Sequence, residues 1–181
     1  MNIYSIDAHS AGRVAGLMST IKPDWWDYAG AEEQLQNEKL LARLVGWYLG
    51  EDPESPRGWV LCAEFEGYRC LSIENLGYDD NGTFVMEEPL EPLLLQAERH
   101  ARGKGYRNLK YVISSTGMSC HGRPIVDFAK ELADLRSYGR EHYDYFHRFG
   151  FVPAGFLPNC YGEGHHGIIM VKELTPEEGK P

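Results

Sequence analysis

The sequence has no long apolar run, little cysteine and no excess of positive charge, and each absence excludes a class of protein. No stretch approaches the roughly 18 apolar residues that a membrane-spanning helix needs, so we expect no membrane partner. The four cysteines are neither dense nor closely paired, which predicts reduced thiols and a cytoplasmic location. The first residues contain no basic segment followed by an apolar core, so we expect no secretory signal.

The charge balance narrows the set of partners. Acidic residues outnumber basic ones by 27 to 18, which gives a net charge of −9. Such a surface repels the phosphates of nucleic acid, so we expect no nucleic-acid partner. It tolerates or attracts cations such as amines, although the same acidity can serve only to keep the protein in solution.

Length and patterning predict one mixed α/β domain. The 181 residues are 43% hydrophobic and 25% charged, as in an ordinary globular protein, and contain no repeat or linker. We expect a single domain over residues 1–174 and a frayed polar tail over residues 175–181.

Apolar alternation predicts seven strands, and helical spacing predicts helices between them. The predicted strands are residues 1–6, 43–50, 58–65, 68–77, 109–115, 151–157 and 166–174. The predicted helices are residues 10–21, 31–44, 90–102, 123–139 and 140–149. A tight turn at Glu66-Gly67 would place Glu64 opposite Arg69, a favourable pair of charges across a hairpin.

Three stretches of the C-terminal half carry a family resemblance. They are "LLLQAERHARGKGYRNLKYVIS", a helix leading into a strand; "YFHRFGFVPAGFL", a helix that ends at Gly-Phe and enters a strand; and "PNCYGEGHHGIIMVKEL", a closing hairpin. With the order of the elements, they resemble the GNAT superfamily of acyl-CoA-dependent N-acyltransferases. The resemblance implies an α+β fold with a largely antiparallel sheet of six to seven strands, flanked by helices on both faces. It also implies transfer of an acetyl group from acetyl-CoA to a primary amine of a small molecule or peptide.

The family's phosphate-binding loop is not matched in this sequence. In the family, acyl-CoA lies between the fourth and fifth strands, and its pyrophosphate sits on an Arg/Gln-x-x-Gly-x-Gly/Ala loop at the N-terminus of the central helix. Here that loop falls on "VMEEPLE", with Val85, Glu88 and Leu90 at the motif positions. Glu87, Glu88 and Glu91 place negative charge there, which would repel phosphate although it stabilises a helix N-terminus. Either "DDNGTFV" supplies an unusual loop, or affinity for CoA is weak or absent.

The resemblance nevertheless implies cofactor-binding positions. These are Leu76 at the end of the fourth strand, Gly82 and Thr83 in the turn that follows, and Ser114 and Ser115 at the end of the fifth strand. The hydroxyls of Ser114, Ser115 and the following Thr116 can hydrogen-bond the pantetheine or a substrate, although such hydroxyls also cap turns routinely.

Candidate catalytic residues follow from the same comparison. Glu74 lies where the family's catalytic carboxylate often lies, and partial burial would raise its pKa toward that of a base; the alternative is an exposed edge residue. The family's usual tyrosine, the general acid, is replaced by Phe146. Tyr145 is therefore our first candidate for the acid and Tyr143 the second, unless these aromatic side chains only pack against the sheet.

The remaining predictions concern the substrate side. Trp25, His147 and Tyr161 are candidate substrate-binding residues. A helical insertion at about residues 117–139, longer than the family's usual connection, could form a lid or a dimer contact, so a homodimer is possible. No Cys-x-x-Cys or His-x-x-x-His pair exists, so we expect no metal. The rival to an acetyltransferase is a binding or regulatory protein that keeps this fold and does not use CoA.

Overall fold

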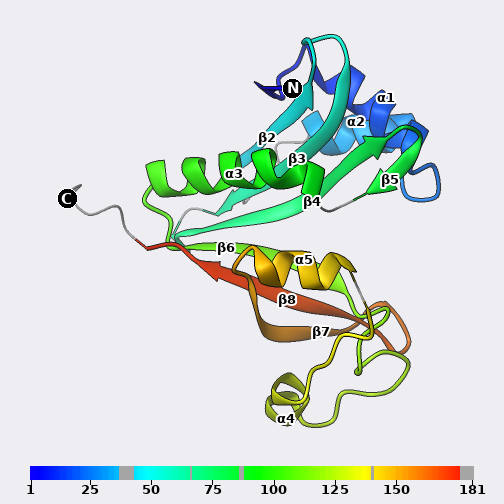
Figure 1. The fold of residues 1–181 in the computed structure, drawn as a ribbon, viewed down its shortest axis with the longest axis vertical. Helices are drawn as coiled ribbons and strands as arrows, with labels where there is room; N and C mark the ends of the chain where they lie inside the picture. The colour runs from blue at the N-terminus through cyan, green and yellow to red at the C-terminus, as the bar shows by residue number, and fades with distance from the viewer. Residues whose placement is uncertain (37–42, 66, 86–87, 140, 176–181) are drawn as a thin grey trace.

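An eight-stranded sheet forms the centre of the molecule (Figure 1). The computed structural model describes residues 1–36, 43–65, 67–85, 88–139 and 141–175. Its strands are β1 (Asn2–Ser5), β2 (Arg43–Gly50), β3 (Pro56–Phe65), β4 (Cys70–Asp80), β5 (Thr83–Val85), β6 (Asn108–Ser114), β7 (Val152–Gly162) and β8 (His165–Glu173). The strand order is β1-β2-β3-β4-β6-β8-β7, with the short β5 paired to β4. Only β4 and β6 run parallel, and all other neighbours are antiparallel.

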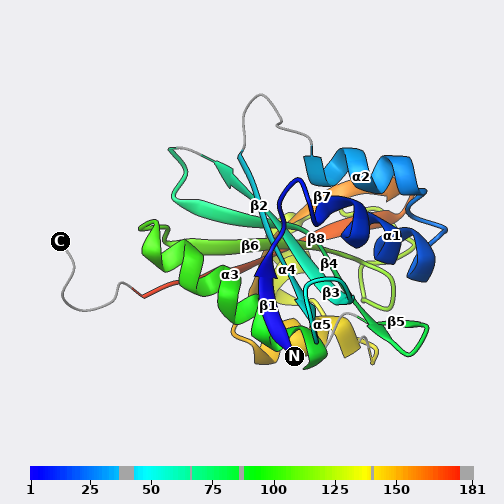
Figure 2. The same ribbon diagram turned by 90° about the horizontal axis from the view of Figure 1, so that it is seen from above.

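Helices cover both faces of this sheet (Figure 2). They are α1 (Ala11–Ile21), α2 (Tyr28–Gln36), the 3-10 turn η1 (Glu88–Leu90), α3 (Glu91–Gly103), α4 (Phe128–Ala133) and α5 (Glu141–Arg148). α1 and α2 lie on one face, while α3 and α5 lie on the other. The predicted fold class is therefore confirmed, and the eighth strand, β5, comes from the stretch that the sequence marks only as a turn or loop.

The core is divided into two clusters by the sheet. The larger cluster joins α3 and α5 to β2–β4, β6, β7 and β8 and contains Leu93, Leu94 and Phe146. The smaller cluster joins α1 and α2 to β2 and β3 and contains Met18 and Trp59. Helices on opposite faces thus hold the sheet rigid from both sides.

No helix in the described part of the chain is long and apolar enough to cross a membrane.

The β3–β4 hairpin differs from its predicted register. Phe65 pairs with Cys70 and Glu64 with Leu71, so Glu64 does not face Arg69. Arg69 takes a positive φ of 48°, which places it in the connection rather than in the strand. Glu64 is instead buried against α3, where its Oε1 lies 2.6 Å from His100 Nε2. The register prediction is wrong because a partner on a distant helix, not the local charge pair, determines where this carboxylate lies.

The predicted helices over residues 31–44 and 123–139 both differ from the structure. α2 is described to Gln36, residues 37–42 lie outside the described residues, and Arg43 and Leu44 belong to β2 rather than to a helix. Within the insertion only α4 is helical, and it begins where Asp127 accepts a hydrogen bond from the backbone N–H of Lys130. The rest of the insertion is held by bonds to other segments, described below, so a long helix does not form there.

Candidate active site

Strands β4 and β6 run side by side for only four residue pairs and then separate. The parallel pairing joins Cys70–Ile73 to Asn108–Tyr111. Beyond that point β6 follows β8, whereas β4 follows β3 and diverges, as the right-hand half of Figure 1 shows. The same edge of β4 is occupied again from Tyr78, which pairs with Val85 of β5. Among the described strands, none pairs with residues 74–77 along this edge of β4, and we call this stretch the β4 window.

A β-bulge lies at the start of the β4 window. Cys62 pairs with Ile73 and Leu61 with Asn75, so Glu74 is the extra residue. Bulges re-aim side chains and are common beside active sites. The Glu74 side chain is exposed, so the expectation of partial burial is wrong. Burial raises the pKa of the Cys62 thiol, and the negative charge of the nearby Glu74 carboxylate raises it further.

Aromatic rings cover the α1/α2 side of the β4 window. Asn75 Oδ1 accepts a hydrogen bond from Trp59 Nε1 at 3.0 Å, and Asn75 Nδ2 donates to Gln34 of α2 at 3.0 Å. Gly77 leaves room for two rings, since a Cβ there would lie 2.5 Å from Phe84 and 2.6 Å from Trp59. The side chains of Trp59, Phe84 and Asn75 thus line the β4 window on this side.

The substrate-binding candidate Trp25 lies at the outer edge of these rings. It is exposed and meets Phe84 edge to face at a centroid distance of 5.6 Å. The Lys22 ammonium lies 4.6 Å from the centroid of the Trp25 ring. The Trp25 ring thus makes a cation–π contact with Lys22. The same kind of contact would suit a cationic substrate.

The proposed cofactor residues Gly82 and Thr83 do not form an open loop. Asp80 pairs with Thr83 across a two-residue turn, with φ of 53° at Asn81 and 88° at Gly82. Two positive φ values at Asn-Gly are those of a type I′ hairpin turn. The Gly82 N–H donates to Asp79 Oδ1 at 2.5 Å and is not available to an anion. The structure therefore favours a hairpin role for both residues, while Leu76 lies in the β4 window itself.

The N-terminus of α3 offers a poor phosphate site. Leu90 caps the helix without a side-chain hydrogen bond, Glu91 lies in the first turn, and Pro92 has no N–H to donate. Glu87 lies outside the described residues. The negative charge expected from "VMEEPLE" is thus present at Glu91. The first turn of α3 also has one backbone N–H fewer to offer a phosphate, because Pro92 has none.

On α5 the two candidate tyrosines have different environments. Phe146, at the position of the family's tyrosine, is fully buried among the rings of Tyr111, Tyr145 and Phe151. Tyr145 is only 5% exposed and belongs to the same core cluster, so its ring packs in the core, and its role as the general acid stays a prediction.

Tyr143 is the more accessible of the two. It is half-buried and stacks on His147 at a centroid distance of 6.0 Å. Burial and the neighbouring Asp144 raise the pKa of Tyr143, so its hydroxyl keeps its proton at neutral pH. A group that holds its proton is suited to donate it to a leaving thiolate.

A cluster of hydroxyl and imidazole groups gathers at the end of β6. The Oγ of Ser114 lies 2.6 Å from His165 Nε2 and 2.9 Å from Thr116 Oγ1. Thr116 Oγ1 is itself 3.1 Å from the same imidazole nitrogen. The rings of His121 and Tyr161 flank His165 at 5.0 and 5.2 Å. Ser114 and Tyr161 are thereby brought together, on the opposite face of the sheet from Tyr143 and His147.

Ser115 has a structural role beside this cluster. It is fully buried, and its Oγ accepts a hydrogen bond from the His166 N–H at 2.9 Å. His166 Nδ1 accepts from the Asn159 N–H at 3.0 Å, which leaves Nε2 to donate to the Arg123 carbonyl at 2.8 Å. This chain of bonds ties the insertion to the β7–β8 hairpin. Ser115 therefore supports the site rather than lining it.

Sequence reasoning assigned no role to Asn75 and did not single out His165, although it named Thr116 beside Ser114 and Ser115. The signal for His165 was present, because alternation along β8 places it and its neighbour His166 on opposite faces. The pairing of β6 with β8, which brings His165 to Ser114, is not visible in the sequence.

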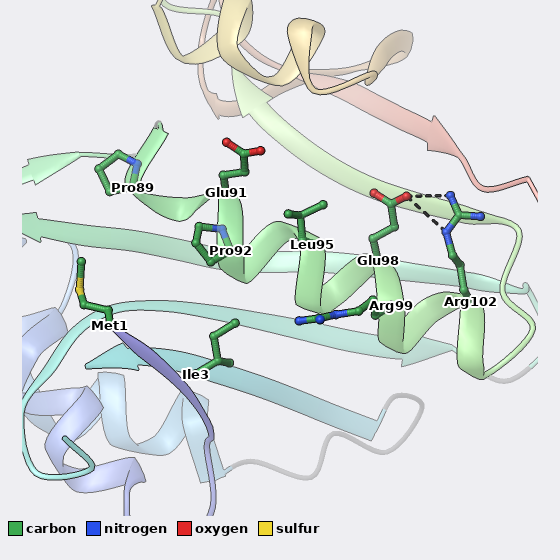
Figure 3. Close-up of a pocket in the computed structure, with 9 residues that line it drawn as sticks. All are labelled: Met1, Ile3, Pro89, Glu91, Pro92, Leu95, Glu98, Arg99 and Arg102. Atoms are coloured by element: carbon green, nitrogen blue, oxygen red, sulfur yellow. Dashed lines mark hydrogen bonds and ion pairs between the residues drawn. The ribbon is translucent and has the colours of Figure 1, made fainter. Parts of the chain in front are cut away.

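A separate pocket of about 760 Å³ lies between β1 and the outer side of α3 (Figure 3). Its lining residues are Met1, Ile3, Pro89, Glu91, Pro92, Leu95, Glu98, Arg99 and Arg102. The partly buried carboxylate of Glu98 there forms ion pairs with Arg102 at 2.7 Å and Lys172 at 2.6 Å. The pocket shows no pairing of a base with a nucleophile, so we place the chemistry at the β4 window.

Among the described residues, no group of three or more His, Cys, Asp or Glu side chains could hold a metal ion.

Comparison with known proteins tests the fold. No family model matches the sequence, and no curated protein is similar to it in sequence. Among solved structures, an aminoglycoside 6'-N-acetyltransferase complexed with coenzyme A has a TM-score of 0.79 at 15% identity, covering 98% of this chain and 99% of that one. The aminoglycoside 6'-N-acetyltransferase from Enterococcus faecium has a TM-score of 0.76 at 16% identity, with coverage of 98% and 99%.

The ribosomal-protein-S18-alanine N-acetyltransferase from Escherichia coli has a TM-score of 0.63 at 11% identity, covering 99% of this chain and 98% of that one. These likenesses extend over nearly the whole length of both partners in each comparison. The chain therefore has the fold of the GNAT superfamily of N-acyltransferases.

Proposed function

We propose that this protein transfers an acetyl group from acetyl-CoA to a primary amine of a small molecule or peptide. The observation that carries the proposal is the β4 window, residues 74–77, whose edge no described strand pairs with and which lies between the segments that pair with β6 and β5. An extended chain that carries amide groups can add to such an edge as a further strand would. The pantetheine arm of acetyl-CoA has that shape and those groups.

The site around the β4 window suits acyl transfer. The amine would attack the thioester carbon, so that a C–N bond forms as the C–S bond breaks. Of the residues predicted from the sequence, Glu74 stays a candidate base, and Tyr143 is the accessible candidate for protonating the thiolate. The three similar structures named above are acetyltransferases of aminoglycosides and of a ribosomal protein, which supports an amine acceptor without selecting one.

Two observations favour the rival, a GNAT-fold protein that does not use CoA. Phe146 occupies the usual tyrosine position and is fully buried. Glu91 and Pro92 weaken the N-terminus of α3 as a phosphate site. In the rival, the β4 window would bind another extended ligand.

Binding of acetyl-CoA separates the two candidates. A ligand at one hundred times its Kd stabilises the native state by about 2.7 kcal/mol, which a thermal-unfolding titration detects. Calorimetry with acetyl-CoA, pantetheine and adenosine 3',5'-bisphosphate would then show which part of the molecule binds. No stabilisation at millimolar acetyl-CoA would contradict the acetyltransferase.

The charge at α3 provides a matched test. If the pyrophosphate lies near the α3 N-terminus, Glu91→Gln should tighten binding of CoA by roughly two- to fivefold, since one such charge contributes about 0.3–1 kcal/mol. Glu51→Gln removes the same charge from the exposed segment after β2 and is the control. Equal Kd values for the two variants would place the pyrophosphate elsewhere.

A further inference from the structure

We propose that His165 is the terminal proton acceptor of the reaction, reached from the amine through the hydroxyls of Ser114 and Thr116. The inference rests on the proposed function and assigns its base to the end of β6 instead of to Glu74. It starts from three contacts among three groups. His165 Nε2 lies 2.6 Å from Ser114 Oγ and 3.1 Å from Thr116 Oγ1, and the two hydroxyl oxygens lie 2.9 Å apart.

The cluster lies on an accessible face of the sheet, beyond the point where β6 leaves β4. Ser114 is three residues beyond Tyr111, the last residue of β6 that pairs with β4, which is about 10 Å along a strand. Leu109, Tyr111 and Ile113 point into the core under α3 and α5. Alternation therefore directs Ser114 to the other face, where α1 and α2 lie. On that face Ser114 and its neighbour Val112 are partly exposed, and Thr116 is exposed.

The hydrogen bonds give the cluster a direction. The backbone N–H of Thr116 donates to Ser114 Oγ at 3.1 Å, which uses one of its two acceptor positions. The Ser114 hydroxyl then has its proton to give to His165 Nε2 and one lone pair left for the Thr116 hydroxyl. Such an arrangement passes a proton from the exposed Thr116 through Ser114 to the imidazole.

The proton balance of the step is simple. As the amine nitrogen bonds to the thioester carbon, one N–H bond breaks and its proton goes to a hydroxyl oxygen of the relay. The proton of that hydroxyl moves to His165 Nε2, and solvent later removes it. The electron pair of the broken C–S bond stays on the sulfur of CoA, which takes a proton from Tyr143 or from solvent.

The same geometry predicts partial redundancy between the two hydroxyls. Both Ser114 Oγ and Thr116 Oγ1 lie within hydrogen-bond distance of Nε2, so either one alone keeps a route to the imidazole. General-base catalysis contributes typically 10²–10⁴-fold, so His165→Gln should lower kcat by about 100-fold or more. Ser114→Ala or Thr116→Val alone should lower it by only about tenfold. The double variant should fall to the level of His165→Gln, because the three groups act as one unit.

The pH profile of kcat/KM identifies the group that titrates. His121 and Tyr161 are titratable groups whose rings face His165. The wild-type protein should lose activity at acid pH as His165 becomes protonated, and His165→Gln should lack this acid limb. His121→Gln, the matched control, should retain it. An acid limb that survives His165→Gln and disappears in Glu74→Gln would overturn the relay.

Two further measurements do not depend on the choice of amine. Nitrogen-15 NMR of the imidazole should show neutral His165 with Nε2 unprotonated and Nδ1 protonated. A proton on Nε2 would reverse the direction of the relay and overturn the proposal.

Mass spectrometry after incubation with acetyl-CoA should show Ser114 unmodified. An acetylated Ser114 would instead show that this residue is a nucleophile. Absence of transfer by the wild-type protein would contradict the proposed function, whereas these two results judge the relay by itself.

Discussion

The two faces of β6 and β8 are built from alternating residues of the same strands, yet they have different properties. On the face under α5, His166, Ile168 and Met170 are buried. On the opposite face, His165 and Ile169 are partly exposed. Two consecutive histidines thus have different roles, one as a buried connection and one as part of an accessible hydroxyl cluster. Residue type alone does not identify a site, because the face of the strand decides what each side chain meets.

The largest expected loss of stability comes from a substitution on the face of the sheet that α5 covers. Phe146→Ala should lower the free energy of unfolding by about 3–5 kcal/mol, because it removes a fully buried ring that contacts Tyr111 and Phe151. Chemical denaturation of the variant measures this loss. A loss below about 1 kcal/mol would show that α5 is not packed on the sheet as described.

The two histidines should differ in the same experiment. His166→Leu leaves the Asn159 N–H and the Arg123 carbonyl without their buried partner and should lower the free energy of unfolding by about 2–4 kcal/mol. His165→Leu, the matched control on the open face, should cost less than about 1 kcal/mol because water can replace its bonds to the hydroxyls. Equal losses for the two variants would contradict the assignment of one histidine to structure and the other to function.

A smaller loss of stability is expected from a substitution at Glu98 of α3. Burial by itself would raise the pKa of Glu98, but hydrogen bonds from Lys172 and Arg102 outweigh it and hold that pKa below its ordinary value of 4.5. Glu98→Gln should therefore lower the free energy of unfolding by about 1–2 kcal/mol at neutral pH.

This loss should depend on pH. A carboxylate whose pKa is lower in the folded state stabilises that state above its unfolded pKa, and the contribution disappears as the pH falls through the folded value. The difference between wild type and Glu98→Gln should thus be full above about pH 5 and shrink below the ordinary value of 4.5. Denaturation curves at several pH values measure it. A difference that stays constant down to pH 3 would mean that the carboxylate does not carry the effect.

Local patterns were sufficient to predict most elements. The alternation in "LKYVISS" and "HGIIMVKEL" gives β6 and β8 with small changes of boundary, and the apolar spacing of Leu93, Leu94, Ala97 and Ala101 gives the buried side of α3. The errors lie where a distant partner competes with a local rule. Glu64 leaves its expected cross-strand partner for His100, and the insertion stays largely irregular because Arg123 is bound through its carbonyl to His166.

The sequence by itself determined the order of strands and helices, the acidic surface, the aromatic α5 and the replacement of the family's tyrosine by Phe146. These depend on residue type and on short-range periodicity, which a linear pattern contains in full. The tertiary structure alone decided where β4 leaves β6, that Glu74 is the extra residue of a bulge, and that His165 meets Ser114. Each of these depends on strand pairing between residues far apart in the chain, and a shift of one residue in that pairing would turn His165 to the other face.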